Sequence, residues 1–143
     1  MNLNAMQEKI IGYIEADYEK YLDRYGMGKP HVSTEFMDLD RHKRDFTLFI
    51  DFNRIGFAKG KFADDCSRSA QIGISVFLVF RNAAPEKLRE AMLDGASAFY
   101  DLMANCGIAQ ETAISELNNF SIVEGSKFIA ISEFSLTFEM EAS

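Results

Sequence analysis

The sequence predicts an α+β domain, in which two main helices pack on an antiparallel (mixed) sheet of about four strands. Apolar residues recur every three or four positions in two segments and alternate with other residues in several more. Two strands follow one another between the helices, an order typical of an antiparallel sheet with helices packed on it. The chain has 143 residues, of which 48% are hydrophobic, so we expect residues 1–143 to form a single domain.

Residues 3–22 predict the first helix. Asn4 and Gln7 have the spacing of a capping box near its start. The stretch from Tyr25 to Pro30 contains two glycines and a proline, which predicts the end of the helix. The apolar and aromatic residues recur at spacings that place them on one helical face: Leu3, Met6, Ile10, Ile14, Tyr18 and Tyr21.

Two strands are predicted in the middle of the chain, at residues 43–52 and 71–80. In the first, four apolar residues at alternate positions share one face of the strand. In the second, one set of alternate positions is wholly apolar, and the other set becomes apolar halfway along. Residues 31–42 allow either a short strand or a polar, turn-like segment.

The connection between these two strands predicts the tip of a long hairpin. It runs from Arg54 to Ser69 and is rich in charged residues and glycine. Phe57 and Phe62 lie in this tip. Large aromatic side chains in a polar arm either contact another molecule or fold back onto the sheet, and the sequence leaves both open.

A second helix is predicted from Pro85 to Cys106. Proline suits the first helical turn, and Gly107 suits the position just after the end. One face of this helix is apolar, with small residues that allow a close approach to a sheet. The apolar stripe consists of Leu88, Met92, Ala96, Phe99, Met103 and Cys106.

The last part of the chain predicts a final long strand at residues 127–140. Residues 110–118 allow a short helix or an irregular connection, and residues 120–123 could begin a further strand. The apolar positions change parity between Ile131 and Phe134. This change predicts either a β-bulge or a strand that is first buried on both faces.

Four apolar residues on the second face of the predicted sheet lack an obvious cover: Phe77, Val79, Ile129 and Ile131. Burying each such side chain stabilises a protein by about 1.5–3 kcal/mol. With both helices on one face, these residues are a candidate interface with a partner, together with Phe57 and Phe62. The alternative is that one helix covers each face.

Charge is distributed unevenly along a chain whose formal net charge is −7. Residues 1–40 have a net charge of −4, residues 41–68 of +3, and residues 86–143 of −7. These segments are either solvated faces or opposed surfaces that favour head-to-tail contact between copies. A basic footprint for nucleic acid is missing at the level of the whole chain, so we expect no specific nucleic-acid binding.

Two stretches of the sequence match motifs for a bound ion or a phosphate only in part. Asp51, Asn53 and Gly56 match the first positions of a calcium loop, but Ile55 and Phe62 replace oxygen ligands. The stretch "GFAKGKF" resembles a phosphate loop but has the wrong spacing and lacks the hydroxyl residue. We therefore expect no metal and no cofactor.

Neither histidine nor cysteine residues predict a catalytic site. His31 and His42 have no cysteine or histidine partner at metal-binding spacing, and neither belongs to a nucleophile motif. Cys66 and Cys106 are expected to be free thiols. No signal segment or apolar run long enough to span a bilayer is evident, so we expect neither secretion nor membrane contact.

The order of elements resembles that of the tail terminator, or tail-completion, proteins of tailed phages and prophages. The resemblance covers residues 3–22 and 70–141, through "LNAMQEKIIGYIEADYEKYL", "IGISVFLVFRN", "APEKLREAM" and "GSKFIAISEFSLTFEME". It implies a non-enzymatic α+β subunit without catalytic residues, located in the virion tail or the bacterial cytoplasm. The family forms a ring, typically hexameric, that caps the tail tube and meets the head connector, so the implied partners are copies of the chain, the tail-tube protein and the head-connector protein.

Two other classes of function remain open at this point. The first is a small-molecule-binding α+β domain, with a pocket between the sheet and the helix at residues 85–106. Small residues on that helix beside Phe99 and Met103 motivate this alternative. The second is an enzyme of a type that no motif in the sequence identifies.

Overall fold

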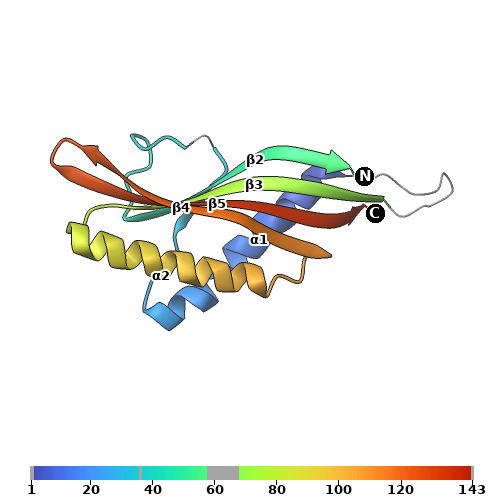
Figure 1. The fold of residues 1–143 in the computed structure, drawn as a ribbon, viewed down its shortest axis with the longest axis horizontal. Coiled ribbons are helices and arrows are strands. Elements are labelled where there is room, and N and C mark those ends of the chain that lie inside the picture. Colours follow the sequence, from blue (N-terminus) through green and yellow to red (C-terminus); the bar gives the residue numbers. More distant parts are fainter. Residues whose placement is uncertain (1, 36, 58–67, 143) are drawn as a thin grey trace.

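Five strands form one mixed sheet in the computed structural model, which describes residues 2–35, 37–57 and 68–142. Both long helices lie on the same face of this sheet (Figure 1). The strand order is β1-β2-β3-β5-β4, with β1 parallel to β2 and all other neighbours antiparallel. The α+β class is confirmed, with five strands where about four were predicted. The elements are α1 (Leu3–Leu22), the 3-10 helix η1 (Asp23–Tyr25), β1 (His31–Ser33), β2 (Phe46–Phe57), β3 (Arg68–Phe80), α2 (Pro85–Ala104), β4 (Glu111–Glu124) and β5 (Lys127–Ala142).

Helix α1 begins earlier than the capping box predicted from Asn4. Asn2 is the N-cap, and its side-chain oxygen accepts a 3.0 Å hydrogen bond from the backbone N–H of Ala5. The end of the helix is as predicted, because Gly26 follows η1 with a φ of 66°, in the left-handed region that glycine adopts easily. The predicted apolar face is buried, including Ile10 and Tyr18.

Residues 110–118 were predicted as a short helix or an irregular connection, but all of them except Gln110 belong to strand β4. This strand and β5 form a hairpin whose register closes with Glu124 opposite Lys127, and Gly125 takes a φ of 63° in the turn. The prediction was wrong because β4 lies at the edge of the sheet and most of its side chains are exposed. An edge strand with little buried surface shows no clear apolar alternation.

Strand β5 pairs with β3 without any register shift, from Ala142 opposite Arg68 to Ala130 opposite Phe80. The predicted bulge between Ile131 and Phe134 is therefore absent, and the second explanation applies. The first part of β5 is buried on both faces, since residues 129–132 are all buried. Bulges occur in β2 and β4 instead.

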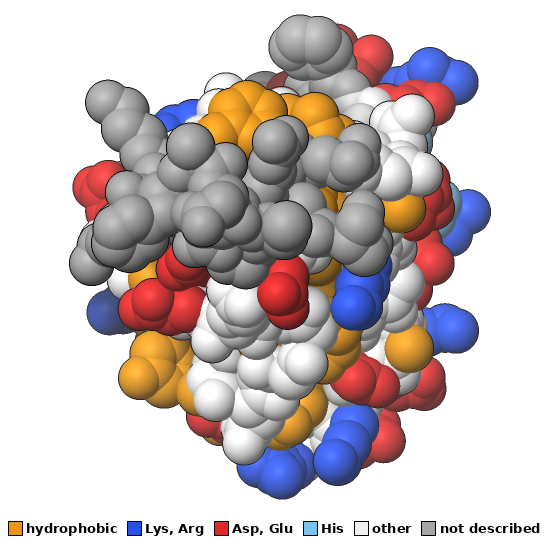
Figure 2. Space-filling view, turned by 90° about the vertical axis from the view of Figure 1, so that its right-hand side faces the viewer, with side chains coloured by type: hydrophobic (Ala, Val, Ile, Leu, Met, Phe, Trp, Pro, Cys, Tyr) orange, Lys and Arg blue, Asp and Glu red, His pale blue; other side chains and the backbone are white. Residues whose placement is uncertain are grey.

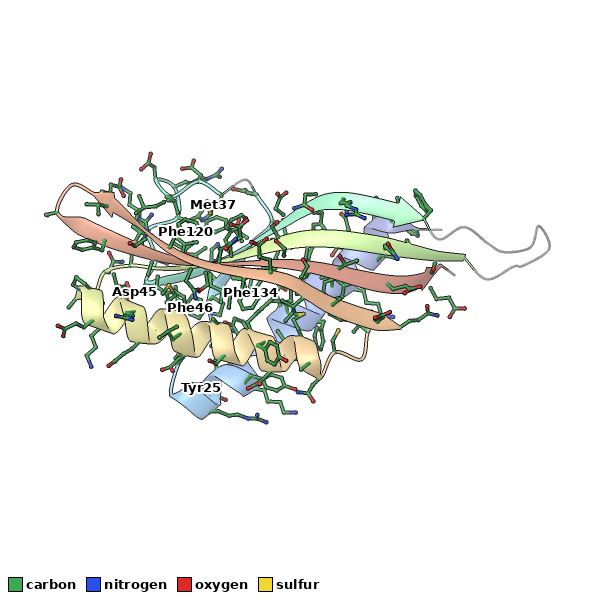
Figure 3. All side chains as sticks on the ribbon, in the orientation of Figure 1. Tyr25, Met37, Asp45, Phe46, Phe120 and Phe134 are labelled. Atoms are coloured by element: carbon green, nitrogen blue, oxygen red, sulfur yellow. The ribbon has the colours of Figure 1, made fainter. Side chains whose placement is uncertain are left out.

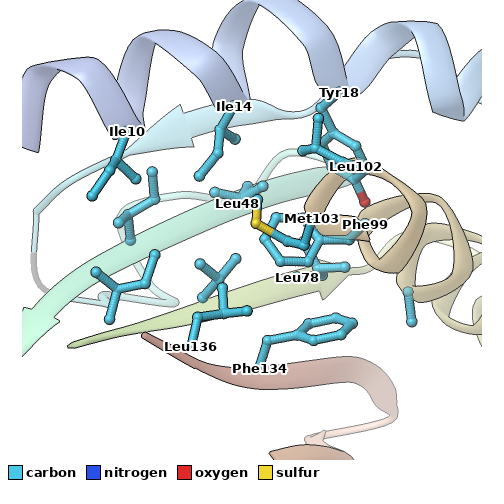
Figure 4. Packing of buried hydrophobic residues seen from close by; sticks show 14 of the residues in the cluster. Ile10, Ile14, Tyr18, Leu48, Leu78, Phe99, Leu102, Met103, Phe134 and Leu136 are labelled. Carbon is cyan, nitrogen blue, oxygen red and sulfur yellow. The ribbon is translucent and has the colours of Figure 1, made fainter. Parts of the chain in front are cut away.

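The main hydrophobic core lies between the sheet and the two helices. Figure 4 shows Ile10, Ile14 and Tyr18 of α1 directed toward the same interior as Phe99 of α2 and Phe134 of β5. The ring of Phe99 contacts both Tyr18 and Phe134, with centroid separations of 5.5 and 4.8 Å. This packing fixes the positions of α1 and α2 on the sheet.

The opposite face of the sheet is covered by the chain itself. We call the described residues 34–35 and 37–45, between β1 and β2, the covering loop. Its Met37 and Leu39 pack against a second cluster of buried side chains. The cover therefore comes from a loop and not from a helix, and burial of this cluster requires no partner molecule. The cluster consists of Phe49, Val79, Ile129 and Ile131.

Candidate functional site

Three of the predicted interface residues lie inside the chain. Val79, Ile129 and Ile131 have exposed fractions of 1%, 2% and 0%. Phe77 packs against them and is half-buried. The expectation that these side chains lie open for a partner is thus corrected, because the covering loop was not foreseen.

Phe57 is a predicted interface residue whose side chain is exposed to solvent. It ends strand β2 and is 62% exposed. Phe62 lies outside the described residues. Phe57 thus provides one apolar contact point at the end of β2, on the side of the sheet opposite β4.

Hydrogen bonds hold the covering loop to the end of β3. The Arg81 guanidinium donates a 2.6 Å bond to the carbonyl of Leu39, and the Arg81 backbone N–H donates to the carbonyl of Asp45. The Asn82 side chain donates to the Asp45 carboxylate at 2.8 Å. Asn82 has a φ of 66°, which non-glycine residues rarely adopt, and asparagine tolerates it best.

Both histidines help to fasten the same loop. The rings of His31 and His42 stack with a centroid separation of 5.6 Å, and His42 also lies edge-on to Phe49. The Glu35 carboxylate lies 3.6 Å from His42. Desolvation, with smaller contributions from Arg44 and His42, lowers the pKa of His31, while Glu35 opposes the shift. Both histidines therefore help to hold the covering loop in place.

Exposed apolar side chains that were not predicted as contact residues lie on the β4–β5 hairpin. We call these four residues, Leu117, Phe120, Val123 and Phe128, the hairpin patch; they are 41%, 38%, 60% and 42% exposed. Val123 and Phe128 are direct cross-strand neighbours. Figure 3 shows Phe120 on the side of the sheet away from the helices, as Met37 is. The run "FSIVEGSKF" is the sequence signal, since it joins apolar residues to a turn.

A groove adjoins this hairpin where α2 begins. It has a volume of about 370 Å³, and Leu88 and Met92 of α2, Phe120 of β4, and Phe128 and Ala130 of β5 line it. The predicted pocket beside Phe99 and Met103 is not open, because those side chains are 0% and 3% exposed within the core. The groove lies nearer the start of the same helix.

The hydroxyl groups of Tyr18, which is buried, and Tyr13, which is partly buried, make hydrogen bonds between the two helices. The Tyr18 hydroxyl donates a 2.7 Å hydrogen bond to the carbonyl of Gly95, and the Tyr13 hydroxyl donates a 2.6 Å bond to the carbonyl of Leu102. Burial raises the pKa of both phenols. These bonds tie α1 to α2. In the part of the chain that the structure describes, no three potential metal ligands lie together.

Charged side chains of both signs are interspersed on the end of the molecule near the chain termini. Figure 2 shows acidic and basic groups next to apolar side chains there, without a continuous area of one sign. At one edge of the sheet, strand β4 carries Glu111, Glu116 and Glu124 and no basic residue. The described residues 41–57 carry four basic and two acidic side chains.

No protein-family model and no curated protein matches this sequence. Neither α1 nor α2 has the length and hydropathy of a membrane-spanning helix, and the described residues contain no other helix of that length.

Proposed function

We propose that this chain is a non-enzymatic structural subunit that assembles with copies of itself, as the phage tail terminators do that its sequence resembles. The assembled ring would cap a tail tube and offer a surface to the head connector. It would form in the bacterial cytoplasm and remain in the virion tail.

The observation that carries this proposal is the hairpin patch on the β4–β5 hairpin, at the edge of the sheet. Its side chains are large and apolar, yet 38–60% of each remains exposed in the single chain. Leu117, Val123 and Phe128 lie on the helix side of the hairpin and Phe120 on the other side, so both faces of this edge carry exposed apolar side chains. Full burial of such a side chain is worth about 1.5–3 kcal/mol. Assembly would provide that burial.

Light scattering coupled to size-exclusion chromatography tests the proposal at micromolar concentration, with and without tail-tube protein. We expect a ring-sized species that electron microscopy shows as closed particles. Val123→Ser should reduce the ring fraction, whereas Ser121→Thr, on the same strand, should not. A protein that stays monomeric under both conditions contradicts the proposal.

A second candidate function is the binding of a small apolar molecule. The groove between α2 and the β4–β5 hairpin supports it, because about 370 Å³ lies within the usual size range of ligand pockets. Anilinonaphthalene sulfonate should then fluoresce with the folded protein, and Met92→Trp should reduce the signal by filling the groove. An absent signal with the folded wild type removes this candidate.

A further inference from the structure

Two strand edges remain open in the described part of the sheet. Strand β1 pairs with β2 only from Thr47 to Phe49, so the outer edge of residues 50–57 has no strand beside it. At the other end of the sheet, β4 pairs with β5 alone. Each open edge presents backbone N–H and C=O groups that another strand can pair with.

The β4 edge carries few of the devices that normally prevent strand addition. Its bulge lies before Glu116, and residues 112–119, the part that can lie beside residues 50–57 of β2, contain no proline or lysine and one charged residue, Glu116. All but Thr112 and Ile114 of these residues are exposed. A long edge segment of this composition is a template for a further strand.

The directions of the strands select the geometry of such a contact. Successive neighbours from β2 through β3 and β5 to β4 are antiparallel, so β2 and β4 run in opposite directions. A second copy related by rotation about an axis along the strands keeps the direction of its β2. Strand β4 of one copy therefore meets β2 of the next in an antiparallel pair, and the contact repeats head to tail.

Charge favours this pairing over the pairing of β4 with a second β4. All three charged residues of β4 are glutamates, and like charges placed opposite each other destabilise a sheet. Arg54, in contrast, lies on the open edge of β2 and is exposed. Within residues 50–57, Arg54 is the one basic residue and Asp51 the one acidic residue, so Arg54 is the group that suits an acidic strand.

A register with Arg54 opposite Glu116 also matches the two faces of the sheet. Arg54 is opposite Gly73, which is opposite Thr137, while Glu116 is opposite Ser135. Thr137 and Ser135 share a face of β5, so the arginine and the glutamate point to the same side. The β2 bulge between Phe52 and Arg54 then brings Phe52 opposite Leu117, both on the helix side.

We propose that β4 of one copy adds to residues 50–57 of β2 in the next copy, with Glu116 opposite Arg54. The occupant of the open β4 edge is thus a second copy of this chain. The inference rests on the proposed self-assembly and assigns the edges that carry it. The sheets of neighbouring subunits become continuous.

Charge reversal tests the pairing. Glu116→Arg and Arg54→Glu should each weaken association about fivefold, since they replace an attractive cross-strand pair by a repulsive one. The double variant should restore association. Glu133→Arg, an acidic residue of β5 instead of the edge, is the control and should leave association unchanged. Failure of the double variant to recover, with all variants folded by circular dichroism, overturns the register.

Cross-linking distinguishes this inference from the proposed function. Asp51→Cys and Asn118→Cys, each in a chain with Cys66→Ala and Cys106→Ala, would be opposite each other in the proposed register. Mixed chains should form a disulfide-linked pair that neither variant forms alone. Rings without this cross-link overturn the edge pairing and leave self-assembly standing, and a link in Asn118→Cys alone shows β4–β4 pairing instead. Absence of any assembly overturns both proposals.

Discussion

Gly95 of α2 packs directly against the ring of Phe80 on β3. A Cβ atom at position 95 would lie 2.6 Å from the Cζ atom of Phe80, closer than real contacts allow. The Phe80 ring stacks on Phe46 with a centroid separation of 4.4 Å, which limits its freedom to move. The absence of a side chain at Gly95 thus sets the separation of α2 from the sheet.

Gly95→Ala should therefore reduce the free energy of unfolding. Overpacking costs about 1–3 kcal/mol, which exceeds the gain of about 1 kcal/mol that alanine brings to a helix interior. Gly12→Ala is the matched control, because nothing lies within 4 Å of a Cβ at position 12 of α1. Urea denaturation should show the control to be slightly more stable than wild type; equal stabilisation of both variants contradicts the close contact.

Ile131→Ala should destabilise the isolated chain by about 2–5 kcal/mol, because it leaves a cavity in the cluster under the covering loop. Val123→Ala, on the same hairpin but 60% exposed, should change stability by less than about 0.5 kcal/mol. Both are measured on dilute protein by chemical denaturation. An unaltered midpoint for Ile131→Ala means that the loop does not cover this residue in solution.

The stability of the chain should fall on mild acidification because of His31. Its pKa is lowered in the folded state, so below its usual value near 6.5 the unfolded chain binds more protons. The contribution of neutral His31 to the free energy of unfolding is fully present above pH 6.5. It is lost as the pH falls toward the pKa of His31 in the folded state. Protonation brings His31 into repulsion with Arg44 and His42, and Glu35 compensates only in part.

Urea denaturation at several pH values on either side of 6.5 measures this effect. His31→Gln should flatten the dependence in that window, whereas carboxylate protonation at lower pH affects both proteins equally. If the free energy of unfolding depends on pH in the same way in the variant and the wild type, protonation of His31 is not linked to folding.

Phe57→Ser should weaken assembly without altering the fold. The side chain is 62% exposed at the end of β2, so its replacement removes little buried surface from the single chain. Analytical ultracentrifugation should show fewer large species, and the melting temperature of the monomer should stay as in the wild type. Unchanged assembly together with unchanged melting would show that Phe57 makes no contact.

Regular apolar spacing predicted the elements that lie on the main core. The faces of α1 and α2 and the alternation in β2 and β3 follow directly from burial between two helices and a sheet. Residues 120–123, which were predicted as a possible strand, belong to strand β4, but the earlier part of β4 was not predicted as a strand. Its side chains are mostly exposed, and an exposed edge imposes no apolar period. The candidate contact surface was missed for the same reason.

Only part of the candidate site could be anticipated. Phe57 is exposed, as a contact residue must be, whereas Val79, Ile129 and Ile131 are buried. Their apolar character indicated that the second face of the sheet needs a cover, but the predicted interface with a partner was wrong for these three residues. It could not show what covers it, because Met37 and Leu39 lie in an irregular loop without a recognisable pattern.

The sequence by itself determined the class of fold, both long helices and the two-sided burial of the central strands, because these depend on local periodicity. The tertiary structure decided which surfaces remain open. It placed both helices on one face, brought the covering loop onto the other through Arg81 and Leu39, and left β4 at the edge. Exposure depends on which distant segments meet, and contacts between distant residues leave no period in the chain.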